Sequence, residues 1–192
     1  MTLVPNASKK YLDLGEDIVM KKVLLVTDML EGFLRRKYPL YCGPQSERII
    51  PFVRKKVQEY GRTGDLVVFI ADNHDRHDLE FKKFPPHCIK GSPETEVIAE
   101  LQGLAQREIY LPKKRYTAFY GTRLDKILAK EKPELVEVVG VCTNICVLYT
   151  VEELQNMDYR TRVYQKGVAS FDQAAAQWAL GQMKSVLGAE VV

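Results

Sequence analysis

The chain consists of short apolar runs that alternate with longer segments of helical periodicity. The runs are rich in β-branched residues and are apolar at nearly every position, instead of at every second one. This pattern is typical of strands in a parallel sheet, because both faces of such a sheet are covered. We predict strands at residues 22–28, 66–72, 109–112, 135–141 and 160–168.

The segments between these runs place apolar residues three and four positions apart, which is the spacing of an amphipathic helix. The alternation predicts an α/β protein of three α/β/α layers, with a doubly wound, mostly parallel, Rossmann-like sheet of five or six strands. We expect one domain over residues 22–192, preceded by an N-terminal extension, residues 1–21. The predicted helices are 45–60, 94–101, 123–130, 144–157 and 171–187.

The composition is that of one globular domain: 46% of the 192 residues are apolar, 28% are charged, and the net charge is +3. Acidic residues dilute the basic ones, so we expect no nucleic-acid partner. No run approaches the roughly 18 apolar residues of a membrane span. Asp13, Glu16 and Asp17 lie where a secretory signal would be apolar. We therefore expect a cytoplasmic protein without a membrane partner, whose four cysteines are packed thiols, metal ligands or nucleophiles.

Acidic residues end the first two strands, and all three histidines follow the second one. Asp28, after the first strand, is either a turn residue or part of a site at the sheet edge. Asp72 and His74 point to the same side of an extended backbone, and His87 can complete a set of two histidines and one carboxylate. Simple surface exposure would explain one loop histidine but not the cluster, which includes His77. The pattern favours a divalent-metal site.

The segment GVCTNICV predicts a buried strand that turns directly into a helix. Thr143 or Asn144 can cap this helix, so that Cys146 lies in its first turn. The helix dipole and free N–H groups at that end favour a thiolate and can hold an oxyanion. The alternative is that Cys142 and Cys146 are small core residues. Their spacing of four does not fit a zinc pair.

Lys113 follows the weak third strand and begins the basic run of residues 113–115. Taken alone, it would be assigned to the surface. However, an acid, a lysine and a cysteine at three strand ends would meet at one crevice of this fold. There the ammonium can lower the thiol pKa or stabilise an anionic intermediate. Asp28, Lys113 and Cys146 are therefore the candidate catalytic residues.

Three motifs in this order and spacing resemble the isochorismatase-like cysteine hydrolases, and in particular their nicotinamidase-like branch. They are VTDMLEGF, KKRYTAFYGTRL and GVCTNICV. The resemblance implies the isochorismatase-like hydrolase fold, with Asp28 as general base and acid, Lys113 as electrostatic partner and Cys146 as nucleophile. It also implies a cis peptide bond between Val141 and Cys142, and an oxyanion hole formed by the backbone N–H groups of Cys142 and Cys146.

The resemblance extends to the histidine-rich segment and to two aromatic residues. Zn²⁺ is the first candidate for the implied metal, and Mn²⁺ and Fe²⁺ are alternatives. Phe33 and Phe84 match aromatic positions that enclose a pyridine ring, although core packing would also explain them. The implied metal ligands are Asp72, His74 and His87, with Glu80 as a further ligand and His77 as the alternative to Glu80.

These features predict a hydrolase that converts nicotinamide to nicotinate and ammonia through a thioester. The substrate is the less fixed part of this prediction, because the chain reads DMLEGF where nicotinamidases usually read Asp-x-Gln-Asn-Asp-Phe. An N-carbamoyl or ureido compound and isochorismate are the enzymatic alternatives. The non-enzymatic alternative is a protein that binds a small ligand without catalysis, although such a protein gains nothing from an activated thiol. The expected partners are a small amide and further copies of the chain, in a dimer or tetramer.

Overall fold

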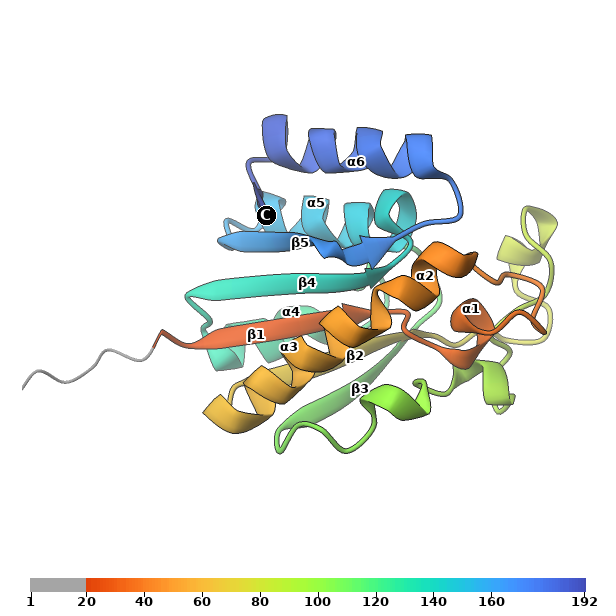
Figure 1. The fold of residues 1–192 in the computed structure, drawn as a ribbon, viewed down its shortest axis with the longest axis horizontal. Coiled ribbons are helices and arrows are strands. Elements are labelled where there is room, and N and C mark those ends of the chain that lie inside the picture. The colour runs from red at the N-terminus through yellow and green to blue at the C-terminus, as the bar shows by residue number, and fades with distance from the viewer. Residues whose placement is uncertain (1–19) are drawn as a thin grey trace, which may run out of the picture.

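The computed structural model describes residues 20–192, which form six parallel strands between two layers of helices (Figure 1). The strand order is β3-β2-β1-β4-β5-β6, and every pairing is parallel. The expected three-layer α/β fold is thus confirmed; the expected extension, except residues 20 and 21, lies outside the described residues. The strands are β1 (Lys22–Thr27), β2 (Leu66–Asp72), β3 (Glu108–Lys113), β4 (Leu135–Val141), β5 (Thr161–Ala169) and β6 (Glu190–Val191).

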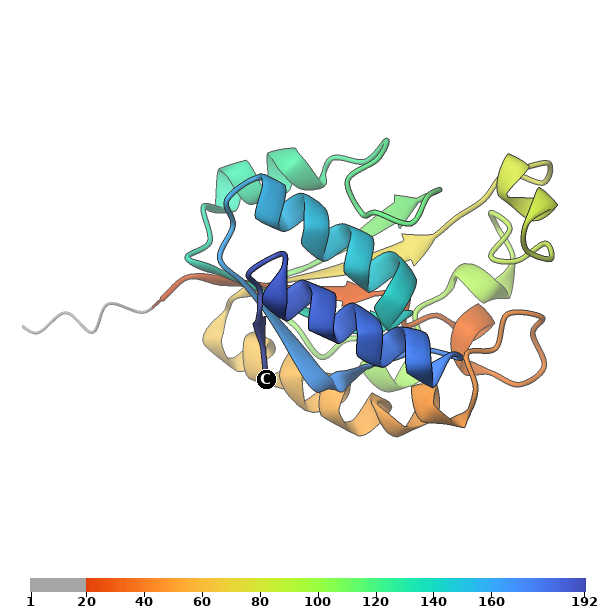
Figure 2. The ribbon, with the colours of Figure 1, turned by 90° about the horizontal axis from the view of Figure 1, so that it is seen from above.

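The helices cover both faces of the sheet because alternate strand residues point to opposite sides. In β1, Leu24 and Val26 belong to one apolar core, and Val23 and Leu25 belong to the other. Figure 2 shows the two helical layers on either side of the sheet. The first core packs against α1 (Glu31–Leu34), α2 (Pro44–Arg48) and α3 (Ile50–Thr63), and the second against α4 (Leu124–Glu131), α5 (Leu148–Asn156) and α6 (Gln173–Ser185).

The predicted helix at 94–101 is wrong. The segment forms two short 3-10 turns, Pro93–Thr95 and Ala99–Leu101, because its backbone bonds to the chain after β1. Glu96 accepts from the Glu31 N–H, and the Ile98 N–H donates to Met29. The predicted helix at 45–60 is divided into α2 and α3, and α3 begins with a proline in its first turn. No helix among residues 20–192 is long and apolar enough to cross a membrane.

The strand order places the site at one edge of the sheet. The chain moves from β1 outward to β2 and β3, then returns to place β4 on the other side of β1. Ligands of open α/β sheets bind where the direction of winding reverses, at the carboxyl ends of the strands. Asp28, directly after β1, and Cys142, directly after β4, lie at this point.

A buried carboxylate connects three elements on the first face of the sheet. Glu137 in β4 accepts hydrogen bonds from Tyr60 of α3 and Tyr164 of β5, and it pairs with Lys56 and Arg162. Burial alone would raise the pKa of this carboxyl. The hydrogen bonds from the two tyrosines and the charge of Lys56 lower it by more, so the net pKa is below the usual value. Glu137 is therefore a charged group that stabilises the fold.

We expect Glu137→Gln to lower the free energy of unfolding by about 2 kcal/mol at pH 7, because it removes the buried carboxylate that two half-buried cations and two tyrosines share. The folded-state pKa is lowered, so this contribution is present above pH 4.5 and is lost as the pH falls below that value. Urea denaturation at pH 7 and pH 4 measures the difference between variant and parent. Glu108→Gln, at an exposed position of β3, is the control. An equal difference at both pH values would contradict the prediction.

Gly140 permits β4 to approach β1 beside the site. Its φ is +119°, and a Cβ atom there would lie 2.0 Å from the carbonyl oxygen of Thr27. We expect Gly140→Ala to destabilise the protein by about 3 kcal/mol or more, because strain and overlap act together. Thermal unfolding measures this, with Gly181→Ala in α6 as control, since open space surrounds that position. Equal melting temperatures for the two variants would contradict the prediction.

Candidate active site

A pocket of about 410 Å³ opens at the carboxyl edge of the sheet. Asp28, Asp72 and Cys146 lie in its wall together with His87, so the ends of β1, β2 and β4 all contribute to it. The remaining lining is mostly apolar. It comprises Phe33, Pro39, Leu40, Tyr41, Cys42, Phe84, Tyr116, Val141, Cys142, Ile145 and Phe171, with Glu80 as the further acid.

The structure brings the three candidate catalytic residues together. The Lys113 ammonium, at the end of β3, lies 2.9 Å from Asp28 Oδ2 and 3.5 Å from Cys146 Sγ. An Asp28 carboxylate oxygen lies within 4.8 Å of the same sulfur. The side chain of Lys113 is fully buried, whereas the neighbouring Lys114 is exposed and pairs with Asp75. Lys113 is therefore the lysine that this site can use.

Two carboxylates share the Lys113 ammonium. Asp72 contacts Lys113 through Oδ1, and its backbone N–H donates to Asp28 Oδ1 at 3.0 Å. Burial and Asp72 raise the pKa of Asp28 to about 6, against the opposing effect of Lys113. Lys113 and the two histidines hold the pKa of Asp72 below its usual value despite burial. At neutral pH, Asp28 is thus ionised and is a stronger base than an ordinary carboxylate.

Cys146 lies in the first turn of the helical segment after β4, as expected. That turn, Thr143–Val147, is π-helical and continues into α5. Burial raises the pKa of Cys146 well above its ordinary value; Lys113 opposes this, and Asp28 and Asp72 add to it. The pKa shift is therefore opposite in direction to the expected thiolate, because burial and two carboxylates outweigh the Lys113 cation. A base must remove the thiol proton during reaction, and Asp28 is in position to do so.

The two residues predicted to form the oxyanion hole belong to this turn: Cys142 directly precedes it, and Cys146 lies within it. The Val141–Cys142 peptide bond is cis, as the resemblance implied. Cys142 and Cys146 both line the pocket, while the Cys142 sulfur packs 3.2 Å from that of Cys42. Sequence reasoning missed Cys42, because nothing local indicates that residues 100 positions apart will touch. The role of the two backbone N–H groups stays a prediction.

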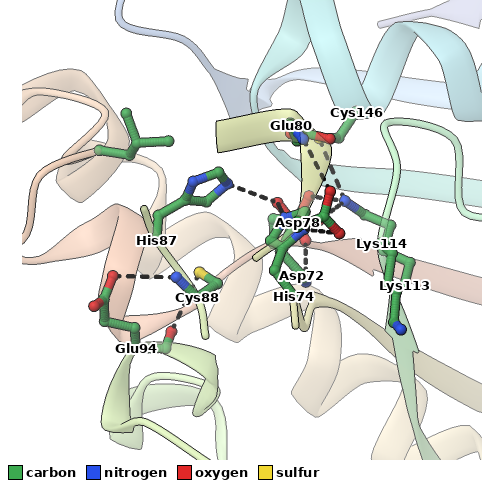
Figure 3. A network of polar contacts seen from close by, with 12 residues as sticks. Asp72, His74, Asp78, Glu80, His87, Cys88, Glu94, Lys113, Lys114 and Cys146 are labelled. Carbon is green, nitrogen blue, oxygen red and sulfur yellow. Dashed lines mark hydrogen bonds and ion pairs between the residues drawn. The ribbon is translucent and has the colours of Figure 1, made fainter. Parts of the chain in front are cut away.

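The three metal-ligand candidates from β2 and the following loop point toward one another (Figure 3). His74 Nε2 lies 3.6 Å and His87 Nε2 lies 3.8 Å from Asp72 Oδ2, and His74 Nε2 has no hydrogen-bond partner among residues 20–192. The other ring nitrogens are held, His74 Nδ1 by Asp78 at 3.2 Å and His87 Nδ1 by the Pro85 carbonyl at 2.8 Å. Metal-binding histidines are typically held in this way. The residues fit a divalent ion such as Zn²⁺.

The remaining predicted residues divide into two groups. Glu80 is buried in the pocket wall, where burial and Asp72 raise its pKa, but it lies outside the compact set of three ligands. His77 is exposed. Phe33 and Phe84 lie in the wall beside His87, with ring centroids 5.8 Å and 6.4 Å from the imidazole. Glu80 is thus closer to the site than its alternative, and both phenylalanines face the pocket.

Known structures share this architecture over most of the chain. The nicotinamidase/pyrazinamidase PncA of Bacillus subtilis is 34% identical, with a TM-score of 0.86, covering 90% of this chain and 100% of its own. The N-carbamoylsarcosine amidase of Thermoplasma acidophilum is 31% identical, with a TM-score of 0.80, covering 90% and 95%. The pyrazinamidase of Pyrococcus horikoshii in complex with zinc is 27% identical, with a TM-score of 0.80, covering 90% and 98%.

The family assignment rests on more than shape. A sequence model described as the isochorismatase domain matches residues 22–192. That range contains the three strand-end residues, the cis peptide bond and the histidine-rich loop. The chain therefore belongs to the isochorismatase family of hydrolases.

Proposed function

We propose that the protein is a cysteine amidohydrolase that converts nicotinamide to nicotinate and ammonia. The observation that carries this proposal is the buried Lys113 ammonium, which lies within 3.5 Å of both Asp28 and Cys146, two residues that line a mostly apolar pocket. A nucleophile, a base and a fixed positive charge at one point are the groups that acyl transfer needs. The similarity to nicotinamidases and the phenylalanines beside His87 support an aromatic amide.

In the first half of the reaction, Asp28 removes the Cys146 proton as the sulfur attacks the amide carbonyl. Lys113 stabilises the charge that develops on sulfur, since it is the cation in contact with it. The N–H groups of Cys142 and Cys146 hold the oxyanion. Asp28 then transfers its proton to the departing nitrogen, so ammonia leaves and a thioester remains on Cys146.

In the second half, the ionised Asp28 removes a proton from water, which attacks the thioester carbonyl. Collapse of the intermediate expels the Cys146 sulfur, which regains the proton held by Asp28, and the acid product leaves as nicotinate after losing its carboxyl proton to solvent. A carboxylate whose pKa is raised to about 6 suits both directions of proton transfer near neutral pH. Asp28 thus acts twice as base and twice as acid.

The metal has a separate role in this proposal. Asp72, His74 and His87 would hold it, with Glu80 as a further or water-mediated ligand. When bound, a divalent ion, Zn²⁺ first and Mn²⁺ or Fe²⁺ as alternatives, supplies a Lewis-acid contact for the pyridine nitrogen. Phe33 and Phe84 enclose the ring beside it.

Charge in the pocket disfavours the other enzymatic candidates. The ionisable side chains among the described lining residues include three acids, Asp28, Asp72 and Glu80, and no lysine or arginine. Isochorismate and N-carbamoyl amino acids carry carboxylates, which would find no cationic side chain in that wall. A neutral amide is therefore the better match.

A homo-oligomer and a cytoplasmic location remain predictions.

We expect the purified protein to release ammonia from nicotinamide faster than from N-carbamoylsarcosine, and to leave isochorismate unchanged. Cys146→Ala should lower kcat by about 10³-fold or more, because the covalent route is lost. Ammonia is measured with a coupled glutamate dehydrogenase assay. Lys114→Ala, next to the active-site lysine but exposed, should keep the parent rate. Ammonia release that survives in Cys146→Ala would exclude the proposed mechanism.

Removal of the metal should slow the hydrolysis of nicotinamide more than that of benzamide, which lacks the ring nitrogen. We expect a chelator to lower kcat/KM for nicotinamide by about 10- to 100-fold and to leave benzamide hydrolysis nearly unchanged. Added Zn²⁺ should restore the parent value. The two substrates are compared in the same chelated preparation, with metal content measured by mass spectrometry. Equal losses for both amides would mean that the metal does not anchor the pyridine nitrogen.

A further inference from the structure

Three consecutive basic residues, which begin at the last residue of β3, each pair with an acid in residues 72–78. This segment starts at the last residue of β2 and contains the candidate metal ligands Asp72 and His74. The acids recur every three positions, at residues 72, 75 and 78, and they meet the basic run in order. Residues far apart in sequence are thereby joined at three successive points. The pairs are Lys113 with Asp72, Lys114 with Asp75, and Arg115 with Asp78.

The third pair reaches a candidate metal ligand. Arg115 Nη1 donates to Asp78 Oδ1 at 2.9 Å and to Oδ2 at 3.1 Å, and the Glu80 N–H donates to Oδ1 at 2.9 Å. Asp78 Oδ2 lies 3.2 Å from His74 Nδ1. The Asp78 side chain is only 5% exposed, so water cannot readily replace these partners.

The donors around Asp78 determine which nitrogen of His74 carries the proton. An ionised carboxylate only accepts hydrogen bonds, so Nδ1 must donate to it. In the neutral ring the lone pair is then on Nε2, which faces Asp72 and lacks a hydrogen-bond partner among the described residues. The contact fixes both the tautomer and the direction of the ring.

We propose that Asp78 and Arg115 are positioning residues that hold His74 in its metal-binding tautomer and orientation and tie the metal loop to the strand end that carries Lys113. This inference rests on the metal site of the proposed function. Arg115 acts through Asp78: its Nη1 donates to both oxygens of the carboxylate and so holds them in place. The Lys114–Asp75 pair is exposed, and among residues 20–192 no side-chain hydrogen bond or ion pair joins it to the His74 ring, which makes Lys114→Ala a matched control.

Zinc affinity of the whole protein tests the proposal without reference to turnover. Competition with a chromophoric chelator gives the Kd for Zn²⁺ of the parent, Asp78→Ala, Arg115→Ala, the double variant and Lys114→Ala. We expect about 10- to 100-fold weaker binding for Asp78→Ala, a smaller loss for Arg115→Ala, and parent affinity for Lys114→Ala. Since Arg115 acts through Asp78, the double variant should bind like Asp78→Ala.

Parent affinity in Asp78→Ala, losses that multiply in the double variant, or no measurable Zn²⁺ binding by the parent would overturn the proposal. If Asp78→Ala fails to fold, Asp78→Asn and Arg115→Ala provide the same comparison. Failure of amide hydrolysis with these affinities intact would count against the proposed function alone.

Long-range ¹H–¹⁵N spectra of the metal-free protein supply a readout that a merely structural role would not move. In the parent, the neutral His74 ring should be protonated at Nδ1 only. In Asp78→Ala a mixture of both tautomers should form, while His87, held by the Pro85 carbonyl, keeps its own pattern. An unchanged His74 spectrum in Asp78→Ala would also overturn the proposal.

Discussion

The Lys113 ammonium lies without solvent exposure between Asp28 and Asp72, and the rest of the site depends on this arrangement. Two neighbouring carboxylates cannot remain ionised in a buried pocket unless a cation and hydrogen bonds compensate for lost hydration. The sheet supplies both, because β1, β2 and β3 are adjacent and their ends coincide. The same cation contacts Cys146, so one charge touches the proposed base, the proposed nucleophile and a candidate metal ligand.

Asp72 connects two kinds of chemistry. One oxygen contacts Lys113, and the other faces His74 and His87. A cation at the histidines and the ammonium at Lys113 therefore act on the same carboxylate, which is held ionised. In the proposed mechanism, this sharing connects the candidate metal site rigidly to the sulfur that attacks the amide. Two further ion pairs, of Lys114 with Asp75 and of Arg115 with Asp78, join the same two segments.

The sequence predicted the sheet because strands that are buried on both faces appear as continuous apolar runs. It also predicted that Asp28, Lys113 and Cys146 meet at the sheet edge, because each follows the end of such a run. It predicted a helix at 94–101 where none forms, since apolar spacing does not reveal that this backbone bonds to residues 29–31. It predicted a thiolate at Cys146, whereas burial, the largest effect, raises the pKa of the thiol, and Lys113 opposes this only in part while Asp28 and Asp72 add to it. Asp78 was missed for a related reason. The sequence shows its spacing from Asp72, but it does not show that the folded chain brings Asp78 into contact with Arg115 and the His74 ring.

In the proposed mechanism, Lys113 and Asp28 act on Cys146 as one unit. This is measured by the kcat/KM for ammonia release from nicotinamide in Lys113→Met, Asp28→Asn and the double variant, with circular dichroism to verify folding. Residues that act as a unit give non-additive losses. We therefore expect the double variant to be about as slow as the slower single variant. Losses that multiply would contradict this expectation, because they would mean that the lysine and the aspartate contribute independently.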